Sequence, residues 1–596
     1  MNTKAAKRLV PALGWLRSYR RVDLAADVLA GSIVAVLLVP QAMAYALVAG
    51  LPPQAGLYAS LAPLVIYALL GTSRYLAVGP VAVVSLLVAG GLAELGTLTP
   101  QQALGVAALL AAASGVIQLG MGLLRAGFVV NFISHPVISG FTSAAALVIV
   151  SSQVAPLLGL SAPRGAAPWE TIVLLAERFG QTKWMTLVVG TLTISVLVAY
   201  PRFVRRLFQA RSLPEWLGAL LPRAAPLLVV VAGTVAAYAL ALDQRFGLAV
   251  VGSIPAGLPE FGLPTFDVAT LRALIPTVVA ISLVGFLESF AVAQSLAARR
   301  RESVDGSQEL VALGVANLGA AFTGGYPVTG GFSRSMVNFG GGARTGFASI
   351  VTASLVALTL VGLTPLLFYL PRAVLAGVIV VAVLPLVDIR TARRVWSYSR
   401  ADGSALLATF LGVFVLGVES GILIGILLSG VLYFARSSRP HVAVVGRVGS
   451  SEHFRNVKRH EVSTVPEVLA IRIDENLFFG NARNIEHHVH QLVAEQRGLR
   501  RLLLIASGIN HIDATGLECL EQLADSLEQA DVELHLAEIK GPVMDRLEQA
   551  GFPERLGRDR IHLSSHVAMV RLDAKRPVEV NRTDASPAEP LRSTHS

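Results

Sequence analysis

Apolar residues dominate the chain from about residue 27 to residue 435, in long runs that short polar loops separate. A helix that crosses a membrane needs about 20 predominantly apolar residues. The runs predict fourteen such spans, of which the third and the tenth are short and open with Gly or Pro. The predicted spans are 27–48, 54–70, 79–95, 102–123, 133–155, 184–200, 223–242, 271–296, 307–322, 328–340, 346–368, 371–387, 402–416 and 419–435.

Composition supports a polytopic membrane protein. Of the 596 residues, 54% are hydrophobic and only 15% are charged, whereas about a quarter of the residues are charged in a typical soluble domain. The net charge of +10 does not indicate a nucleic-acid partner, because the basic residues lie in short loops between apolar runs. The single cysteine, Cys519, excludes an internal disulfide and a thiolate metal cluster.

Lysine and arginine are concentrated in alternate loops, which indicates the orientation of the chain. The basic leader 1–26 and the loops after the sixth, eighth and twelfth spans carry most of them, whereas the loop Leu92–Leu104 has none. The longer loops of the opposite side also contain a few basic residues, so the charge difference between the two sides is one of degree. We expect both termini on the cytoplasmic side of a bacterial-type inner (plasma) membrane.

The apolar region contains an internal repeat. The segment PQAMAYALVAG (Pro40–Gly50) corresponds to LESFAVAQSLA (Leu287–Ala297), so that Gln41 aligns with Glu288. Each is followed at similar spacing by a short segment that opens with Gly or Pro, Val78–Leu87 and Tyr326–Asn338. Seven spans per repeat is an odd number, so the two halves are inverted. Paired interrupted segments in the two halves indicate a transporter binding site.

Two charged residues lie within apolar runs. Glu288 is the only charge in Thr277–Ala298, and Arg334 lies in the short segment that follows the next span. A charged side chain at membrane depth costs roughly 2.5–3.5 kcal/mol on insertion scales, and such residues usually mark an ion or substrate path. A buried structural ion pair between the two is the alternative.

A helix that begins at mid-membrane depth exposes its first backbone N–H groups and its positive dipole end. Two such helix starts, at Pro80–Ala82 and Gly330–Ser333, would form an anion site without a metal. The glycines would let an anion approach the backbone, although tight helix packing is another use for them. The Arg334 fork could bind an oxyanion bidentately. Glu288 could assist only when protonated, which makes it a candidate proton carrier.

After Arg436 the composition becomes that of a soluble domain. We expect strands near Val462–Phe479 and Arg501–Ser507, which alternate with helices as in a small α/β domain. The expected helices are near Asn481–Glu495, Thr515–Gln529 and Pro542–Gln549. The predicted domains are a leader (1–26), a transmembrane transport domain (27–436), a linker (437–461), the α/β domain (462–574) and a disordered tail (575–596).

Four motifs, VPQAMAYALVAGLPPQAGLYAS, GTSRYLAVGPVAVVSLL, FISHPVISGFTSAAA and GGYPVTGGFSRSMVN, closely resemble the SulP family of sulfate permeases and anion exchangers. The resemblance implies seven-plus-seven inverted repeats of the uracil permease type, a core domain that moves against a gate domain, and a homodimer. It also implies that Glu288 is the acid of proton-coupled members. The anion site that it implies consists of Gln41, Tyr45, Val81, Ala82, Ser333 and Arg334.

The segment IASGINHIDATGLECL (Ile505–Leu520) resembles a STAS domain. In the related anti-sigma antagonists this loop carries a hydroxyl that is phosphorylated, and Thr515 occupies its place. Ala506 replaces the usual acidic residue of the preceding strand, which argues against a kinase switch. The alternative is that Thr515 only belongs to a helix N-cap region.

These patterns favour a secondary transporter that takes up sulfate or a similar oxyanion with protons, without a cofactor or an enzymatic activity. Its expected partners are the anion, protons, membrane lipid and a second copy of the chain. A dicarboxylate or bicarbonate transporter and an anion exchanger are alternatives within this class. A channel and a membrane-tethered STAS sensor are alternatives outside it, and an anchor would need neither interrupted helices nor buried charge.

Overall fold

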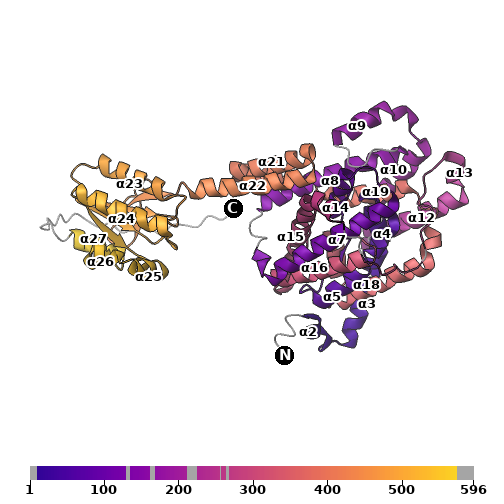
Figure 1. The fold of residues 1–596 in the computed structure, drawn as a ribbon, viewed down its shortest axis with the longest axis horizontal. Coiled ribbons are helices and arrows are strands. Elements are labelled where there is room, and N and C mark those ends of the chain that lie inside the picture. The colour runs from indigo at the N-terminus through magenta and orange to yellow at the C-terminus, as the bar shows by residue number, and fades with distance from the viewer. Residues whose placement is uncertain are drawn as a thin grey trace. The chain divides into compact units, whose positions relative to one another are not determined.

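The computed structural model describes residues 10–128, 134–160, 168–210, 224–255, 257–263 and 267–573. The chain divides into two compact units, Met1–Ser429 and Gly430–Ser596 (Figure 1). We call them the membrane unit and the C-terminal unit and describe each by itself. The predicted disordered tail lies outside the described residues, as do the first nine residues of the leader.

Each predicted span contains a helix. Among the described residues, nine helices are long and apolar enough to cross a membrane, and α6 and α12 are shorter apolar helices. The first half comprises α3 (Arg21–Val48), α4 (Pro53–Tyr58) with α5 (Ala62–Leu70), β1 (Val78–Gly79) with α6 (Ala82–Glu94), α7 (Pro100–Leu123), α8 (His135–Leu158), α10 (Trp184–Ala210) and α12 (Ala225–Ala239).

The second half repeats this order. It comprises α15 (Ile275–Arg300), α16 (Gly306–Phe322), β2 (Thr329–Gly330) with α17 (Phe332–Gly340), α18 (Phe347–Leu358) extended by η4 (Thr359–Leu363) and η5 (Thr364–Leu367), α19 (Arg372–Val383) with η6 (Leu384–Leu386), α21 (Arg400–Leu416) and α22 (Val418–Ser437). Short helices lie between them, namely α2 (Ala12–Leu16), α9 (Pro168–Glu177), η2 (Phe179–Gln181), α13 (Leu242–Phe246), α14 (Val268–Ala273) and α20 (Ile389–Tyr398).

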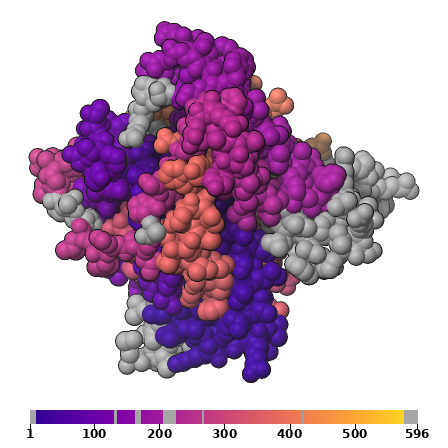
Figure 2. Space-filling model, turned by 90° about the vertical axis from the view of Figure 1, so that its right-hand side faces the viewer, coloured from indigo at the N-terminus to yellow at the C-terminus, as the bar shows by residue number. Residues whose placement is uncertain are grey.

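The two halves are interleaved. Helix α7 packs along α16 (Figure 1), α5 also packs on α16, and α3 packs on α17 and α18. Helices α8, α10, α12, α19 and α21 make a second set of mutual contacts. Figure 2 shows segments of the first half, in indigo and purple, beside an orange segment of the second half on one face of the membrane unit.

The first long helix begins earlier than predicted. Helix α3 starts at Arg21, within the predicted leader, because a capping box stabilises its polar first turn. The backbone N–H of Arg20 donates to the Asp23 carboxylate at 3.0 Å. Asp23 also pairs with Arg344 at 3.0 Å. Charged first-turn residues therefore belong to the helix, although they lie outside its apolar run.

The C-terminal unit is built on a six-stranded sheet of order β4-β3-β5-β6-β7-β8. Strands β5 to β8 are parallel, and β3 pairs antiparallel with β5 and β4. The strands are β3 (Val442–Arg447), β4 (Phe454–Asn456), β5 (Val468–Ile473), β6 (Arg501–Ile505), β7 (Glu533–Ala537) and β8 (Ile561–His562). The helices are α23 (Ala482–Glu495), α24 (Ala514–Gln529), α25 (Gly541–Gln549), α26 (Phe552–Leu556), η7 (Arg558–Arg560) and α27 (Ser565–Asp573).

Two sequence predictions for this unit need correction. The predicted linker 437–461 contains β3 and β4, because Ala443 and Val445 are buried in the core and the strand pairs with β5. The predicted strand Val462–Phe479 shortens to β5, the stretch that hydrogen-bonds to both neighbours.

Close backbone packing brings α4 against α3 beside Gln41. A Cβ atom added to Gly56 of α4 would lie 1.9 Å from the carbonyl oxygen of Ala42. Only glycine therefore lets the two backbones meet at this point.

We predict that Gly56→Ala destabilises the membrane unit by about 1–3 kcal/mol or more, because the added methyl group overlaps backbone that cannot move aside as a side chain would. Gly120→Ala is the control, since a Cβ at Gly120 of α7 meets nothing within 4 Å. Thermal unfolding of the purified variants measures the difference. Equal stability of the two variants would contradict this packing.

Candidate functional site

The starts of α6 and α17 meet at a crossing of two short strands. Val78 pairs with Gly330 and Gly79 with Thr329 in the antiparallel pair β1–β2. The N-cap residues, Val81 for α6 and Gly331 for α17, are extended, and neither helix start is capped by a side chain. The first-turn N–H groups have no intrahelical acceptor. The crossing therefore presents two helix N-termini in the interior of the membrane unit.

Arg334 lies in the first turn of α17 and is 2% exposed. Its Nη1 atom donates to the carbonyl oxygen of Pro80 at the other helix start. Its Nε and Nη2 atoms are buried and have no hydrogen-bond partner. A buried donor without a partner costs about 1–3 kcal/mol, and more when charged. Nε and Nη2 form one edge of the guanidinium fork, which suits two oxygen atoms of an anion.

Glycines make room for this guanidinium. A Cβ at Gly331 would lie 3.0 Å from Nη2 of Arg334, and a Cβ at Gly79 would lie 3.4 Å from the same atom. The fork therefore rests against the strand crossing itself. A Cβ at Gly331 would require the guanidinium to shift, whereas one at Gly79 would only make ordinary contact with it.

Glu288 lies on α15, the helix that packs on β2 and α17. Its side chain is partly exposed, and its buried Oε2 atom has no hydrogen-bond partner. In the part of the chain that the structure describes, no ion pair joins Glu288 to Arg334, although the two interact electrostatically. The alternative of a tight structural ion pair is therefore not the arrangement in this structure.

The structure brings several predicted site residues together. Tyr45 is 8% exposed and lies within electrostatic range of Arg334 and Glu288. Gln41 is 4% exposed and lies one turn earlier on α3, next to Pro40 within the helix. Val81 and Ala82 are each 5% exposed at the start of α6.

Ser333 differs from its neighbours because it is exposed. It lies in the first turn of α17, whereas the adjacent Arg334 and Ser335 are buried. The hydroxyl of Ser335 accepts from the backbone N–H of Ala77 at 3.0 Å and so joins α17 to the segment before β1. Ser335 thus supports the crossing.

Tyr326 and Ser85 also belong to this site but were not among the predicted site residues. Tyr326 is fully buried, and its hydroxyl lies 3.0 Å from Oγ of Ser85 in the first turn of α6. Tyr326 is within electrostatic range of Arg334 and Tyr45. The sequence feature that could have identified Tyr326 is its position in the motif GGYPVTGG, at the start of the interrupted segment.

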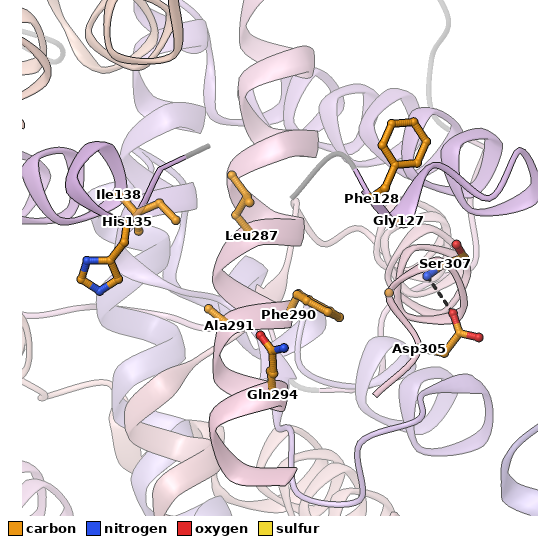
Figure 3. A pocket seen from close by; sticks show the side chains of 11 residues that line it. Gly127, Phe128, His135, Ile138, Leu287, Phe290, Ala291, Gln294, Asp305 and Ser307 are labelled. Atoms are coloured by element: carbon orange, nitrogen blue, oxygen red, sulfur yellow. Dashed lines mark hydrogen bonds between the residues drawn. The ribbon is translucent and has the colours of Figure 1, made fainter. Parts of the chain in front are cut away.

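A cavity of about 540 Å³ lies beside α15, the helix that carries Glu288 (Figure 3). Leu287, Ala291 and Gln294 of α15 line one side, and His135 of α8 lies across from them. Asp305, at the start of α16, accepts from the backbone N–H of Ser307 at 3.0 Å in another part of the lining. The cavity therefore reaches the turn next to Glu288 but does not include the strand crossing.

The predicted regulatory residue Thr515 is exposed in the first turn of α24. The N-cap of that helix is Asp513, whose carboxylate accepts from the backbone N–H of Gly516 at 2.8 Å and of Phe479 at 2.9 Å. Thr515 therefore does not itself cap the helix.

Discontinuous helices that meet in both halves of a membrane unit are typical of secondary transporters. The chain belongs to the sulfate permease family, because the family model matches residues 24–409. A STAS domain model matches residues 459–568. The protein is thus a multi-pass membrane transporter of anions with a C-terminal STAS domain.

Similar proteins agree with this assignment. The chain is 36% identical to the chloroplastic sulfate transporter 4.1 of Arabidopsis thaliana, over 94% of this chain and 82% of the relative. It is 34% identical to the probable sulfate transporter MT1781 of Mycobacterium tuberculosis, over 94% and 97%. A solved structure of SLC26A9 superimposes with a TM-score of 0.87 at 25% identity, over 96% of this chain and 94% of that one.

Two histidines are stacked in the core of the STAS domain. His535 of β7 and His562 of β8 have ring centroids 5.4 Å apart, and Nδ1 of His535 lies 3.2 Å from Nε2 of His562. Desolvation lowers the pKa of both imidazoles below the usual range. The folded domain therefore binds fewer protons than the unfolded chain at mildly acidic pH.

We predict that the contribution of these two histidines to the stability of the domain is fully present above the unfolded histidine pKa of about 6.5. This contribution is lost as the pH falls below that value. Amide hydrogen exchange of β7 and β8 in the full-length protein measures this loss. His562→Gln should flatten the pH dependence, whereas His453→Gln, at an exposed position, should not. If the amide protection of both strands in the unmodified protein did not change with acid pH, the prediction would be contradicted.

Proposed function

We propose that this protein takes up sulfate or a related oxyanion across a membrane together with protons. The observation that carries the proposal is the buried guanidinium of Arg334, whose Nε and Nη2 atoms lack partners beside two uncapped helix starts. These groups form a preorganised set of donors for oxyanion oxygens. The names of the Arabidopsis and Mycobacterium relatives support sulfate as the cargo.

In the proposed site, Gln41, Tyr45 and Ser333 contribute polar side chains, and Val81 and Ala82 contribute backbone N–H groups. Glu288 carries the proton. When Glu288 is ionised, its negative charge competes with the anion for Arg334, and when it is neutral the guanidinium is free to bind the cargo. Binding of the anion therefore favours a protonated Glu288, and both are released together on the other side.

We also propose the setting of this site. The helices of the crossing form a core that moves against a gate containing α8, α12, α19 and α21. The transporter is a homodimer in the inner (plasma) membrane, with both termini in the cytoplasm. The transport domain ends near residue 436, and Thr515 is a candidate regulatory residue of the STAS domain.

Uptake into proteoliposomes tests the proposal. Labelled sulfate, bicarbonate and fumarate are each offered with and without an inward proton gradient. We expect sulfate uptake to exceed the other two and to rise with the gradient. A preference for fumarate or bicarbonate would contradict the proposed substrate. Sulfate uptake that does not depend on the gradient would contradict the proposed proton coupling.

We predict that Arg334→Ala folds but binds sulfate at least about a hundredfold more weakly, because at least two charged hydrogen bonds of about 1.5–3 kcal/mol each are lost. Arg334→Lys should lose much of the activity as well, since a point charge does not reproduce the planar fork. Arg344→Ala is the matched control, since its side chain is half exposed and pairs with Asp23. Unchanged sulfate affinity in Arg334→Ala would remove this residue from the site.

We predict that Glu288→Gln still binds and exchanges sulfate but no longer accumulates it with a proton gradient. The amide has the size of the protonated acid and cannot titrate. Counterflow measures exchange, and net uptake with an imposed gradient measures coupling. Glu302→Gln, at an exposed position beyond the end of α15, is the control. If gradient-driven accumulation survives in Glu288→Gln, the proton travels through another group, and misfolding would favour a structural role.

A further inference from the structure

A chain of hydrogen bonds joins α15 to β2 at the residue after Glu288. The backbone N–H of Gly330 donates to Oγ of Ser289 at 2.7 Å, and Ser289 Oγ lies 2.5 Å from Oγ1 of Thr329. Thr329 in turn donates to the carbonyl oxygen of Gly285 at 2.5 Å. Ser289 must therefore donate to Thr329, so that every proton has one acceptor. We call Ser289 and Thr329 the clasp.

The clasp is fully buried, since both side chains are 0% exposed. It holds one turn of α15 at Gly285 and Ser289 against the last two residues before the N-cap of α17. Arg334 lies in the first turn of α17. The clasp therefore fixes the backbone that carries Glu288 relative to the backbone that carries the guanidinium.

The first repeat has no clasp. Ala42, the residue after Gln41, corresponds to Ser289. Gly79, two residues before the N-cap Val81, corresponds to Thr329 and pairs with it directly across the crossing. Neither Ala42 nor Gly79 has a side chain that forms hydrogen bonds. The strand crossing alone therefore does not require the hydroxyls, and they occur only in the repeat that carries the carboxyl group.

From this asymmetry we infer that Ser289 and Thr329 are positioning residues that transmit the protonation of Glu288 to the anion site. The inference rests on the proposed function. The interaction of two charges weakens as their separation grows, so the effect of Glu288 on anion affinity is largest while the clasp holds Glu288 close to Arg334. Without the clasp, α15 can shift when its charge changes, and the coupling free energy between proton and anion falls.

The test is the pH dependence of labelled-sulfate binding to the full-length protein in nanodiscs. We expect the unmodified protein to bind roughly tenfold more tightly at acid than at neutral pH. In Ser289→Ala and Thr329→Val this ratio should fall toward one. Thr329→Ser keeps the hydroxyl and should restore the ratio. A purely structural clasp would instead weaken binding equally at both pH values and leave the ratio unchanged, which would overturn the inference.

Matched controls exist in the same unit. Ser282→Ala removes a buried hydroxyl of α15 that donates to Val278 of its own helix at 2.7 Å. Thr409→Val removes a buried hydroxyl of α21 that donates to Ala405 at 2.7 Å. Both should keep the wild-type ratio. If either control lost it as fully as the clasp variants do, the effect would not be specific and the inference would fail.

Two further measurements separate the possible failures. Ser289→Cys keeps a side chain of similar size with a weaker donor, so it tests the clasp even if the truncated variants do not fold, and a wild-type ratio in it would count against the inference. Glu288→Gln should abolish the ratio. If Glu288→Gln does so and the clasp variants do not, only the inference fails. If the unmodified protein binds sulfate equally tightly at both pH values, both the proposed proton coupling and the inference fail.

Discussion

The membrane unit depends on one constraint, which is that backbone polar groups in an apolar interior must be satisfied by the protein itself. Two interrupted helices leave free N–H groups at their starts. The strands β1 and β2 satisfy part of this need by pairing with each other. Neither helix start has a side-chain cap, and beside them Arg334 adds two donors that have no protein partner. In the proposed function, an anion completes the arrangement.

Two fully buried carboxyl groups of this unit, Asp27 and Glu309, are well satisfied by hydrogen bonds. Asp27 accepts from the backbone N–H groups of Arg344 and Thr345 and from the Thr345 hydroxyl at 2.6 Å. Glu309 accepts from the Tyr67 hydroxyl at 2.6 Å and from the backbone and hydroxyl of Thr72. Each thereby holds a loop of the opposite repeat. Their full hydrogen bonding marks them as structural residues.

Glu288 contrasts with both, because its Oε2 atom is buried and has no partner. An unsatisfied carboxylate is costly in an apolar interior, whereas its neutral form is much less so. The contrast is a physical reason to assign the proposed mobile proton to Glu288 rather than to Asp27 or Glu309. The sequence alone could not supply it, because Asp27 and Glu309 also border or enter apolar runs.

Sequence patterns predicted the spans and the charged pair of the site, because long apolar runs and isolated charges within them are conspicuous. They missed Tyr326, Ser85 and the clasp, because hydroxyl groups are common in membrane helices and the partners of Ser85 and Ser289 lie far away along the chain. The strand β3 was missed, although it is as long as β5, because it lies in the segment that was taken for a linker and its pairing partner follows that segment. Contacts between distant segments cannot be predicted from local periodicity.

The difference between the repeats suggests how the proposed site could both bind an anion and release it. Inverted repeats supply two similar helix starts, which by themselves would attract an anion equally in every state. In the mechanism that we propose, the second repeat adds a permanent charge at Arg334, a charge that can be neutralised at Glu288, and hydroxyls that hold the two in register. In the proposed cycle, Arg334 faces one anionic partner at a time, either the cargo or the carboxylate. The empty core therefore does not bury an unpaired guanidinium, and the loaded core does not bury the carboxylate beside the cargo when it moves.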